Sequence, residues 1–398
     1  MMRRVVTAII RFIIRIFFRR IELVGLERVP PAGGVIFAVN HPNGLIDPLF
    51  LLCFAPRDVS FLAKAPLFGY PVIGFLVRAF ESIPVYRKQD HVQGTNAETF
   101  GLARALLARG GSIAIFPEGT THSDAHLREL KTGAARIALG CGTKESIVPV
   151  GIYYTAKTDF RSSVLVVFGD PIVVEPAVAG VDGEPPPDRV ESLTKAIDEG
   201  LDEVTLQADS HAALELIGRG EDIFSGDREQ SLAEEFELRR RFVEGYLFLR
   251  AHDPKRLAEL ESMVRRFEMG SVAVRVSLPE LAVATLLLPI AVAGAIINYP
   301  TYRFTGFVAA RLTRENELLA TMKFLAASLF FPLTWIAYAL IFGDALFVLI
   351  AAPLSAYVAM RVFEVFGDAM RRARPVPGAR EAIRARFIEV GEEMALRG

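Results

Sequence analysis

Residues 34–48 read GVIFAVNHPNGLIDP, and the interpretation of the whole chain starts from them. A short apolar run, residues 34–39, ends at a loop of turn-forming residues that carries His41 and, six residues later, Asp47. Strands that end in polar loops are typical of α/β sheets, in which binding loops gather at the carboxyl edge. Histidine titrates near physiological pH, and a carboxylate that fixes its tautomer makes it a general base. An isolated pair of this kind could equally cap a helix and bind local amides.

A second stretch of the same kind is IAIFPEGT, residues 113–120, in which an apolar run ends at Glu118. Further β-branched runs cover residues 146–154 and 164–168, and residues 95–109 have helical spacing. Strands that alternate with helices predict an α/β unit with a mainly parallel sheet flanked by helices. We place this unit at residues 21–180, with both motif loops at the carboxyl ends of their strands.

The composition favours association with a membrane. Hydrophobic residues make up 52% of the 398 residues, and the apolar excess is concentrated near the two ends of the chain. The net charge of −1 says nothing about partners.

Cys53 and Cys141 are the only cysteines, too few for a disulfide framework and consistent with a reducing cytosolic environment. Cys53 stands in an apolar context that predicts an inert thiol, and no G-x-S-x-G elbow is present, so direct transfer between two bound substrates is favoured over a covalent intermediate.

Residues 1–20 are expected to form an amphipathic helix at the membrane interface. Arg11, Arg15 and Arg19 recur every four residues and would form one basic stripe beside a wide apolar face. That pattern suits a helix lying on an anionic membrane. The alternative is an ordinary amphipathic helix of the protein core.

The second half of the chain divides by composition. Residues 181–275, after a proline- and glycine-rich break, form a charged helical region; residues 276–362 hold hydrophobic membrane segments; residues 363–398 form a basic cytoplasmic tail. The basic flanks predict that segments 324–342 and 345–360 span the membrane as a hairpin with Gly343 and Asp344 outside. Segment 281–298, with Pro289 and Gly294, would dip in and return. The catalytic unit would then face the cytoplasm at the inner membrane.

Several polar residues near the two motifs are candidate ligands for a substrate. Glu118 can accept hydrogen bonds from substrate hydroxyls, and Gly119 allows a ligand to approach closely. Arg87, after another apolar run, could hold a phosphate with its planar guanidinium. Other basic residues could share that role or be solvated surface charges: Lys64, Arg128 and Lys131. His122 and His126 have the spacing of a zinc pair but lie in a loop without a glutamate base between them, so no metal site is expected.

Four motifs in this order resemble the phospholipid/glycerol acyltransferase family, over about residues 20–175. They are Asn40-His41 with Asp47, residues 83–87 (IPVYR), residues 116–120 (FPEGT) and residues 148–150 (VPV). The chain departs from the family pattern twice. Five residues rather than four separate His41 from Asp47, and the arginine that often follows F-P-E-G-T is absent. Segments 83–90 and 160–171 are most similar to the fungal-type glycerol-3-phosphate and dihydroxyacetone-phosphate acyltransferases.

The resemblance implies roles for these residues and a reaction. His41 would be the base and Asp47 its partner, Arg87 a phosphate ligand, and Glu118, Gly119 and Thr120 substrate-binding residues. The reaction implied is transfer of a fatty acyl group from acyl-CoA or acyl carrier protein to the hydroxyl of glycerol 3-phosphate in phospholipid biosynthesis. No further cofactor and no nucleic acid are expected; the partners are the acceptor, the acyl donor and membrane lipids. Alternatives are a lysophosphatidate or other lysophospholipid acyltransferase, and a non-catalytic lipid-binding membrane protein.

Overall fold

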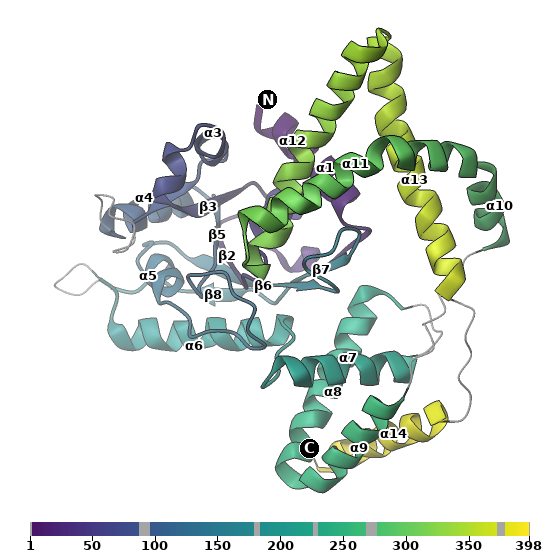
Figure 1. Ribbon diagram of the computed structural model, residues 1–398. Coiled ribbons are helices and arrows are strands. Elements are labelled where there is room, and N and C mark those ends of the chain that lie inside the picture. The colour runs from purple at the N-terminus through teal and green to yellow at the C-terminus, as the bar shows by residue number, and fades with distance from the viewer. Residues whose placement is uncertain are drawn as a thin grey trace. The chain divides into compact units, whose positions relative to one another are not determined.

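The computed structural model describes residues 2–86, 96–178, 184–225, 230–267, 277–371 and 379–397. The chain divides into two compact units. Residues 1–207 together with 315–321 form the first, and residues 208–314 together with 322–398 form the second. In the described residues the first unit contains the β-sheet, and the second consists of helices (Figure 1).

Within the described residues one sheet of eight strands forms the centre of the first unit. The strands are β1 (Arg20–Val24), β2 (Gly34–Val39), β3 (Val59–Lys64), β4 (Ile83–Val85), β5 (Ser112–Ile115), β6 (Glu145–Tyr154), β7 (Ser163–Phe168) and β8 (Ile172–Val174). Their order is β1-β7-β6-β2-β5-β3-β4, and β8 pairs with β6 outside this path. The pairs of β6 with β7 and with β8 are antiparallel, and the other pairs are parallel. The predicted fold class, a mainly parallel sheet with helices, is confirmed.

Strand β2 lies in the middle of the sheet because it is apolar on both faces. All six of its residues are buried, as expected for a strand that helices cover on both sides. Ile36 and Ala38 belong to a core cluster with residues of α4, α5 and α6. Phe37 points to the opposite face, where its ring meets that of Phe168. The strand therefore carries the residues that follow it, Asn40 and His41, to the edge of a rigid core.

Six helices accompany the sheet in the described part of the first unit: α1 (Met2–Phe17), α2 (Ile46–Phe54), α3 (Pro71–Ala79), α4 (Asn96–Ala108), α5 (Gly133–Leu139) and α6 (Pro187–Val204). Helix α6 buries Val190, Ile197 and Leu201 in the core cluster of the sheet. The first unit for this reason continues to residue 207, beyond the boundary near residue 180 that the proline-rich break suggested. An apolar stripe on a charged helix is enough to dock it on the sheet.

Helix α1 is amphipathic, and two of its arginines, Arg11 and Arg15, contact helix α2. Arg11 donates a hydrogen bond to the carbonyl of Cys53 in the last turn of α2, and both Arg11 and Arg15 lie over the ring of Phe54. Carbonyls in the last turn of a helix lack partners within the helix and attract cations. An apolar stripe remains exposed on the other side of α1: Met2, Val5, Ile9 and Phe12. The helix therefore has the expected basic and apolar faces, and its place at a membrane interface stays a prediction.

In the second unit, four helices form a bundle: α7 (His211–Ser225), α8 (Leu232–His252), α9 (Pro254–Arg266) and α14 (Ala379–Arg397). Helix α8 begins with a capping box, in which Ser231 and Glu234 exchange side-chain and backbone hydrogen bonds. Helix α9 begins with Asp253 as its N-cap. These local signals set where the helices start. In the described residues the helices pack through small apolar clusters.

The apolar C-terminal segments form four helices: α10 (Leu278–Leu286), α11 (Leu288–Leu312), α12 (Asn316–Phe342) and α13 (Ala345–Arg371). Helices α12 and α13 are long and apolar enough to cross a membrane, and α10 and α11 meet at a bend of 60°. The two long helices indicate that the protein is associated with a membrane. Pro289 stands in the first turn of α11. Gly294 lies inside α11, where a Cβ atom would stand 2.2 Å from the Ser355 carbonyl, so this glycine permits close packing of α11 on α13 and does not bend the helix.

Candidate active site

The loop that carries His41, called the histidine loop below, begins where β2 ends, and the side chain of Asn40 ties its start to β6. The side-chain Oδ1 of Asn40 accepts a hydrogen bond from the Ile152 backbone N–H at 2.8 Å, and its Nδ2 donates to the Ile152 carbonyl at 3.2 Å. Because β2 and β6 are parallel neighbours, this side chain continues their ladder past the end of β2. His41 is therefore fixed at the carboxyl edge of the sheet, where α/β proteins bind ligands.

The His41 imidazole and the Asp47 carboxylate face each other at hydrogen-bonding distance. Nδ1 of His41 lies 2.9 Å from Oδ2 of Asp47. Helix α2 begins at Ile46, so Asp47 stands in its first turn, and the same Oδ2 accepts the backbone N–H of Asn43 at 2.7 Å. Gly44, with φ +42°, makes the turn between them. This turn accommodates the extra residue of the His-x5-Asp spacing.

A third donor completes the environment of Asp47. The carboxylate is fully buried, and the Tyr154 hydroxyl donates to its Oδ1 at 2.6 Å. Burial and the neighbouring Asp47 carboxylate raise the pKa of Tyr154 well above its usual value, so the phenol keeps its proton. An ionised carboxylate only accepts, which requires Nδ1 of His41 to donate. The other ring nitrogen, Nε2, is then left with a lone pair, as a general base requires.

Glu118 reaches the histidine loop because strands β2 and β5 are parallel neighbours that end side by side. Ala38 of β2 is paired with Ile115 of β5. His41 follows Ala38 by three residues, and Glu118 follows Ile115 by three residues, so the two come to the same level of the sheet. Oε1 of Glu118 accepts the backbone N–H of His41 at 3.0 Å. Oε2 accepts the backbone N–H of Arg128 at 3.1 Å and contacts Nε2 of His122. Glu118 was expected to accept hydrogen bonds from substrate hydroxyls. In this structure its carboxylate is bound to three donors of the protein itself.

His122 is held by both of its ring nitrogens. Its Nδ1 accepts the backbone N–H of Asp124 at 3.1 Å, so Nε2 carries the proton that it shares with Glu118. Its backbone N–H donates to the His41 carbonyl at 3.3 Å. This histidine therefore joins the two motif loops, a role that its spacing from His126 did not suggest.

A cavity of about 110 Å³ opens beside His41. Its walls come from the carboxyl edge of the sheet and from the end of α6: Asn40, His41, Pro42, Glu118, His122, Ser123, Asp124, Ala125, His126, Leu127, Lys157, Thr205, Leu206 and Gln207. The cavity combines a candidate base with a cation, Lys157, and with polar side chains from three different loops. That combination suits a small anionic ligand that carries hydroxyl groups.

Lys157 is the main residue that sequence reasoning missed. Its Nζ lies 3.4 Å from the Pro42 carbonyl and contacts the Ser123 hydroxyl. Burial lowers the pKa of Lys157 from its ordinary value. The loop after β6 matches no motif, so this lysine carried no signal of its own. Only its place after a strand that ends at the same edge as β2 could have pointed to it.

The remaining predicted ligands lie away from this cavity or outside the described residues. Arg87 is among the residues that the structure does not describe. Four others are exposed and do not line the cavity: Lys64, Thr120, Arg128 and Lys131. Gly119, with φ +76°, does not line it either, and the stem of Lys131 lies against it. Asp124 accepts a hydrogen bond from Nε of Arg128 at 2.6 Å and raises the pKa of that guanidinium. Among the described residues the lysine that lines the cavity is Lys157, and a role of Arg128 or Lys131 in phosphate binding stays a prediction.

The first residues of α12 also belong to this site. The Thr321 hydroxyl accepts the backbone N–H of Leu45 at 3.1 Å, and Glu317 accepts a hydrogen bond from Ser123. A Cβ atom on Gly44 would stand 3.0 Å from both the Glu317 carbonyl and the Thr321 hydroxyl. The start of a helix that is apolar enough to cross a membrane therefore packs directly on the histidine loop.

Neither cysteine is suited to act as a nucleophile. Burial raises the pKa of Cys53 to about 12, and burial with the nearby Glu145 carboxylate raises that of Cys141 to about 12 as well. A thiol with so high a pKa holds almost no thiolate at neutral pH. This agrees with the inert character that the apolar context of Cys53 predicted.

Residues 20–153 match the family model described as Acyltransferase, which contains the whole arrangement of His41, Asp47 and Glu118. This region is an acyltransferase domain. The chain is 26% identical to glycerol-3-phosphate O-acyltransferase 1 of Saccharomyces cerevisiae over 82% of its own length and 59% of the relative's length. The chain therefore spans less than two thirds of that relative.

The acyltransferase domain has other relatives as well. The 1-acyl-sn-glycerol-3-phosphate acyltransferase LPAT1 of Arabidopsis thaliana chloroplasts is 27% identical over 35% of this chain and 38% of that protein. A crystal structure of the 1-acyl-sn-glycerophosphate acyltransferase PlsC from Thermotoga maritima aligns with a TM-score of 0.38 at 20% identity, over 51% of this chain and 80% of the other.

Proposed function

We propose that this chain transfers a fatty acyl group from acyl-CoA or acyl carrier protein to a hydroxyl of glycerol 3-phosphate in phospholipid biosynthesis. The observation that carries the proposal is the pair of His41 and Asp47, 2.9 Å apart, beside a cavity that also contains Lys157. The name of the yeast relative, a glycerol-3-phosphate O-acyltransferase, supports the choice of acceptor.

The reaction needs one proton acceptor and no covalent enzyme intermediate. Nε2 of His41 removes the proton of the acceptor hydroxyl, and the oxygen attacks the thioester carbonyl carbon. The tetrahedral intermediate then breaks its C–S bond, and the imidazolium returns the proton to the departing sulfur. Asp47 keeps the imidazole in the required tautomer and stabilises its positive charge during the step, as in the orienting half of a Ser-His-Asp triad.

The acceptor phosphate would bind to the cation of the cavity. Lys157 contacts the Pro42 carbonyl and the Ser123 hydroxyl, both on loops that border His41. A phosphate that replaced these partners would place its own glycerol hydroxyl within the same small cavity as the base. Arg87, from the second family motif, is proposed to share the phosphate, as its sequence context predicts.

A second acceptor is supported by the plant relative, which is a 1-acyl-sn-glycerol-3-phosphate acyltransferase. Lysophosphatidate carries the same phosphate and a free hydroxyl, and differs by one acyl chain. The chemistry at His41 would be unchanged, and only the space around the acceptor would differ. The two acceptors are therefore separated by product analysis rather than by the catalytic residues.

The test uses membranes that contain the full chain, incubated with labelled glycerol 3-phosphate and acyl-CoA and analysed by lipid chromatography. Labelled lysophosphatidate that is absent with a His41→Ala variant supports the proposal. Phosphatidate formed only from added lysophosphatidate supports the second acceptor. Equal product with and without His41 would overturn the mechanism, and no product from either acceptor with any acyl donor would favour a non-catalytic lipid-binding protein.

We also propose that the acyltransferase domain faces the cytoplasm at the inner membrane. Helices α12 and α13 are joined at Gly343 and Asp344, and basic residues mark their far ends: Arg314 precedes α12, and Arg371 is the last residue of α13. An Asp344→Cys variant tests this orientation in intact cells. Labelling by a membrane-impermeant maleimide from outside is expected, and labelling only after the cells are opened would reverse the topology.

A further inference from the structure

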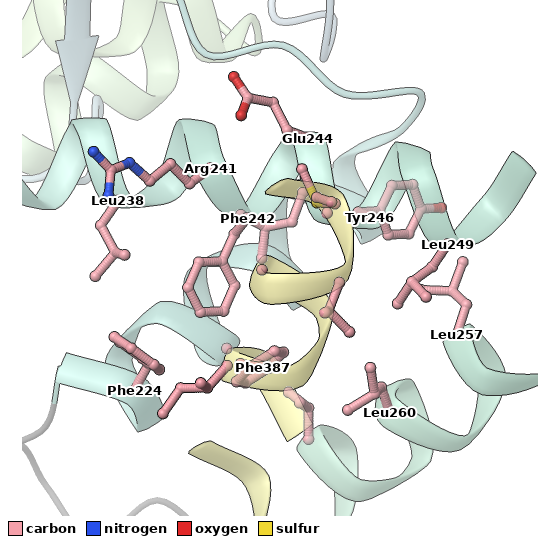
Figure 2. A pocket seen from close by; sticks show the side chains of 18 of the residues that line it. Phe224, Leu238, Arg241, Phe242, Glu244, Tyr246, Leu249, Leu257, Leu260 and Phe387 are labelled. Carbon is pink, nitrogen blue, oxygen red and sulfur yellow. The ribbon is translucent and has the colours of Figure 1, made fainter. Parts of the chain in front are cut away.

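The helical bundle of the second unit contains a large apolar cavity that the acyl-transfer chemistry does not use. Its volume is about 730 Å³, and it is bounded by α7, α8, α9 and α14 (Figure 2). Ligand sites in proteins occupy roughly 300–1,000 Å³ and have mostly apolar walls. Aromatic rings lie at one end, where Phe242 and Phe387 pack with their centroids 4.6 Å apart. Leucines line the other end: Leu249, Leu257 and Leu260.

Two glycines leave free space at the wall of this cavity. Gly245 and Gly391 line the cavity from within α8 and α14. A Cβ atom on Gly245 would touch only Met394 and Val390, at 3.7 Å, and one on Gly391 would meet no atom within 4 Å. Glycine inside a helix is unfavourable, so its presence at these two positions indicates a requirement for space. Gly220 of α7 differs, because a Cβ atom there would stand 3.1 Å from the rings of Phe242 and Phe387, so this glycine permits close packing.

The cavity opens to the surface, and its walls are largely apolar rings and aliphatic side chains. Without a ligand these walls are in contact with water, and covering apolar surface is favourable. A hydrocarbon chain is the ligand whose chemistry matches such a lining.

Charged residues at the edge of the cavity indicate which polar head group a lipid bound there would carry. Arg241 and Glu244 stand one turn apart on α8, are exposed, and project beyond the apolar side chains in Figure 2. Arg241 is the one basic residue among the described residues that line the cavity, and three carboxylates also border it, at Glu244, Glu261 and Glu392. One cation beside a carboxylate complements a phosphate linked to an ammonium group, whereas a purely anionic head would meet an excess of negative charge.

We propose that this cavity binds the acyl chain of a zwitterionic phospholipid or lysophospholipid, with the phosphate at Arg241 and the ammonium group at Glu244. The site is separate from His41 and does not depend on the proposed function. It would give the protein a lipid-binding site at a place distant in sequence from the acyltransferase domain.

The experiment uses the full chain with the His41→Ala substitution, so that the probe cannot be turned over. The protein is placed in nanodiscs of phosphatidylglycerol, whose anionic head group should not compete. The probe is a lysophosphatidylcholine with a photoreactive group in its acyl chain, and crosslinked peptides are identified by mass spectrometry. Crosslinks are expected in residues 216–264 and 387–395.

A Gly245→Leu variant fills the cavity and should lower these crosslinks by about tenfold or more, because overpacking opposes binding of the chain. Gly391→Leu is the second filling variant, and Ala258→Leu, on the exposed face of α9, is the matched control that should leave them unchanged. Unlabelled lysophosphatidylcholine should displace the probe, and palmitate or lysophosphatidate should not. Crosslinks that are no stronger than those on α12 and α13, that survive both filling variants, or that anionic lipids displace best would overturn the proposal.

Discussion

The backbone N–H of His41 donates to Oε1 of Glu118 at 3.0 Å, across 77 residues of sequence. This bond joins the two motifs of the acyltransferase domain, because the other carboxylate oxygen of Glu118 holds Arg128 and His122. Glu118 therefore positions the backbone of His41, the candidate base. Kinetics of a Glu118 variant distinguish this positioning role from direct contact with the substrate.

Replacing Glu118 by glutamine should separate positioning from direct contact with the substrate. The amide keeps one acceptor oxygen but turns an –NH₂ group toward donors that need an acceptor. We expect a loss of about 1–3 kcal/mol in the free energy of unfolding. For a positioning residue kcat falls and the KM for the acceptor is nearly unchanged. A large rise in that KM with a normal kcat would instead assign Glu118 to the substrate.

Removing the imidazole should abolish most of the acyl transfer. General acid–base catalysis typically contributes ~10²–10⁴-fold, so His41→Ala should lower kcat by that order. Asp47→Asn should lower kcat as well, because an amide no longer stabilises the imidazolium or fixes its tautomer. The control is Asp58→Asn, an exposed aspartate that pairs with Arg3 on the surface. A His41→Ala enzyme with normal kcat would exclude the proposed base.

The charge of Lys157 should control affinity for the acceptor. Lys157→Met is expected to raise the acceptor KM by roughly 10–100-fold, since a hydrogen bond to a charged group contributes about 1.5–3 kcal/mol. Lys144→Met serves as the control, because Lys144 is exposed and pairs only with Glu175 at the surface among the described residues. An unchanged KM in Lys157→Met would remove this lysine from the phosphate site.

The lowered pKa of Lys157 predicts how kcat/KM for the acceptor changes with pH. Burial lowers the pKa of Lys157 below its ordinary 10.5, so the free enzyme loses this positive charge at a lower pH than an exposed lysine would. If the charge binds the phosphate, kcat/KM for the acceptor should fall as pH rises through that lowered pKa. Arginine remains protonated, so Lys157→Arg should move the fall to higher pH. A profile identical in both enzymes would contradict the assignment.

Gly44 tests whether the start of α12 positions the histidine loop. Gly44→Ala adds a Cβ atom at φ +42°, 3.0 Å from the Glu317 carbonyl and the Thr321 hydroxyl. Gly33→Ala adds one at φ +81° with no atom within 4 Å, and so carries only the backbone cost. Both should lose about 1–2 kcal/mol of stability, measured by thermal unfolding. Only Gly44→Ala should also lose activity, up to about 10²-fold for a displaced catalytic group; equal activities would show that the contact with α12 is dispensable.

Much of the acyltransferase domain could be predicted because its signals are local. The run of residues 34–39 has the apolar character of a strand buried on both faces, and it became β2. His41 and Asp47 are six residues apart, and the turn-forming residues between them bring the two side chains together.

Other features could not be predicted, because they depend on which segments become neighbours in space. Tyr154 and Lys157 enter the site only because β6 lies beside β2 in the sheet. Arg11 and Arg15 of α1 contact α2, because the carbonyl of Cys53 and the ring of Phe54 lie within their reach. Nothing in the spacing of Arg11 and Arg15 reveals that these partners exist.

The sequence by itself thus determined the strands, the motif loops, the base with its carboxylate and the apolar helices, since backbone periodicity and turn chemistry act over a few residues. Only the tertiary structure decided that Glu118 holds the backbone of His41, that Lys157 supplies the cation, and that Thr321 packs on the loop. Contacts between distant segments depend on strand order and on the packing of side chains from different elements. Neither can be predicted from the residue spacing within a single motif.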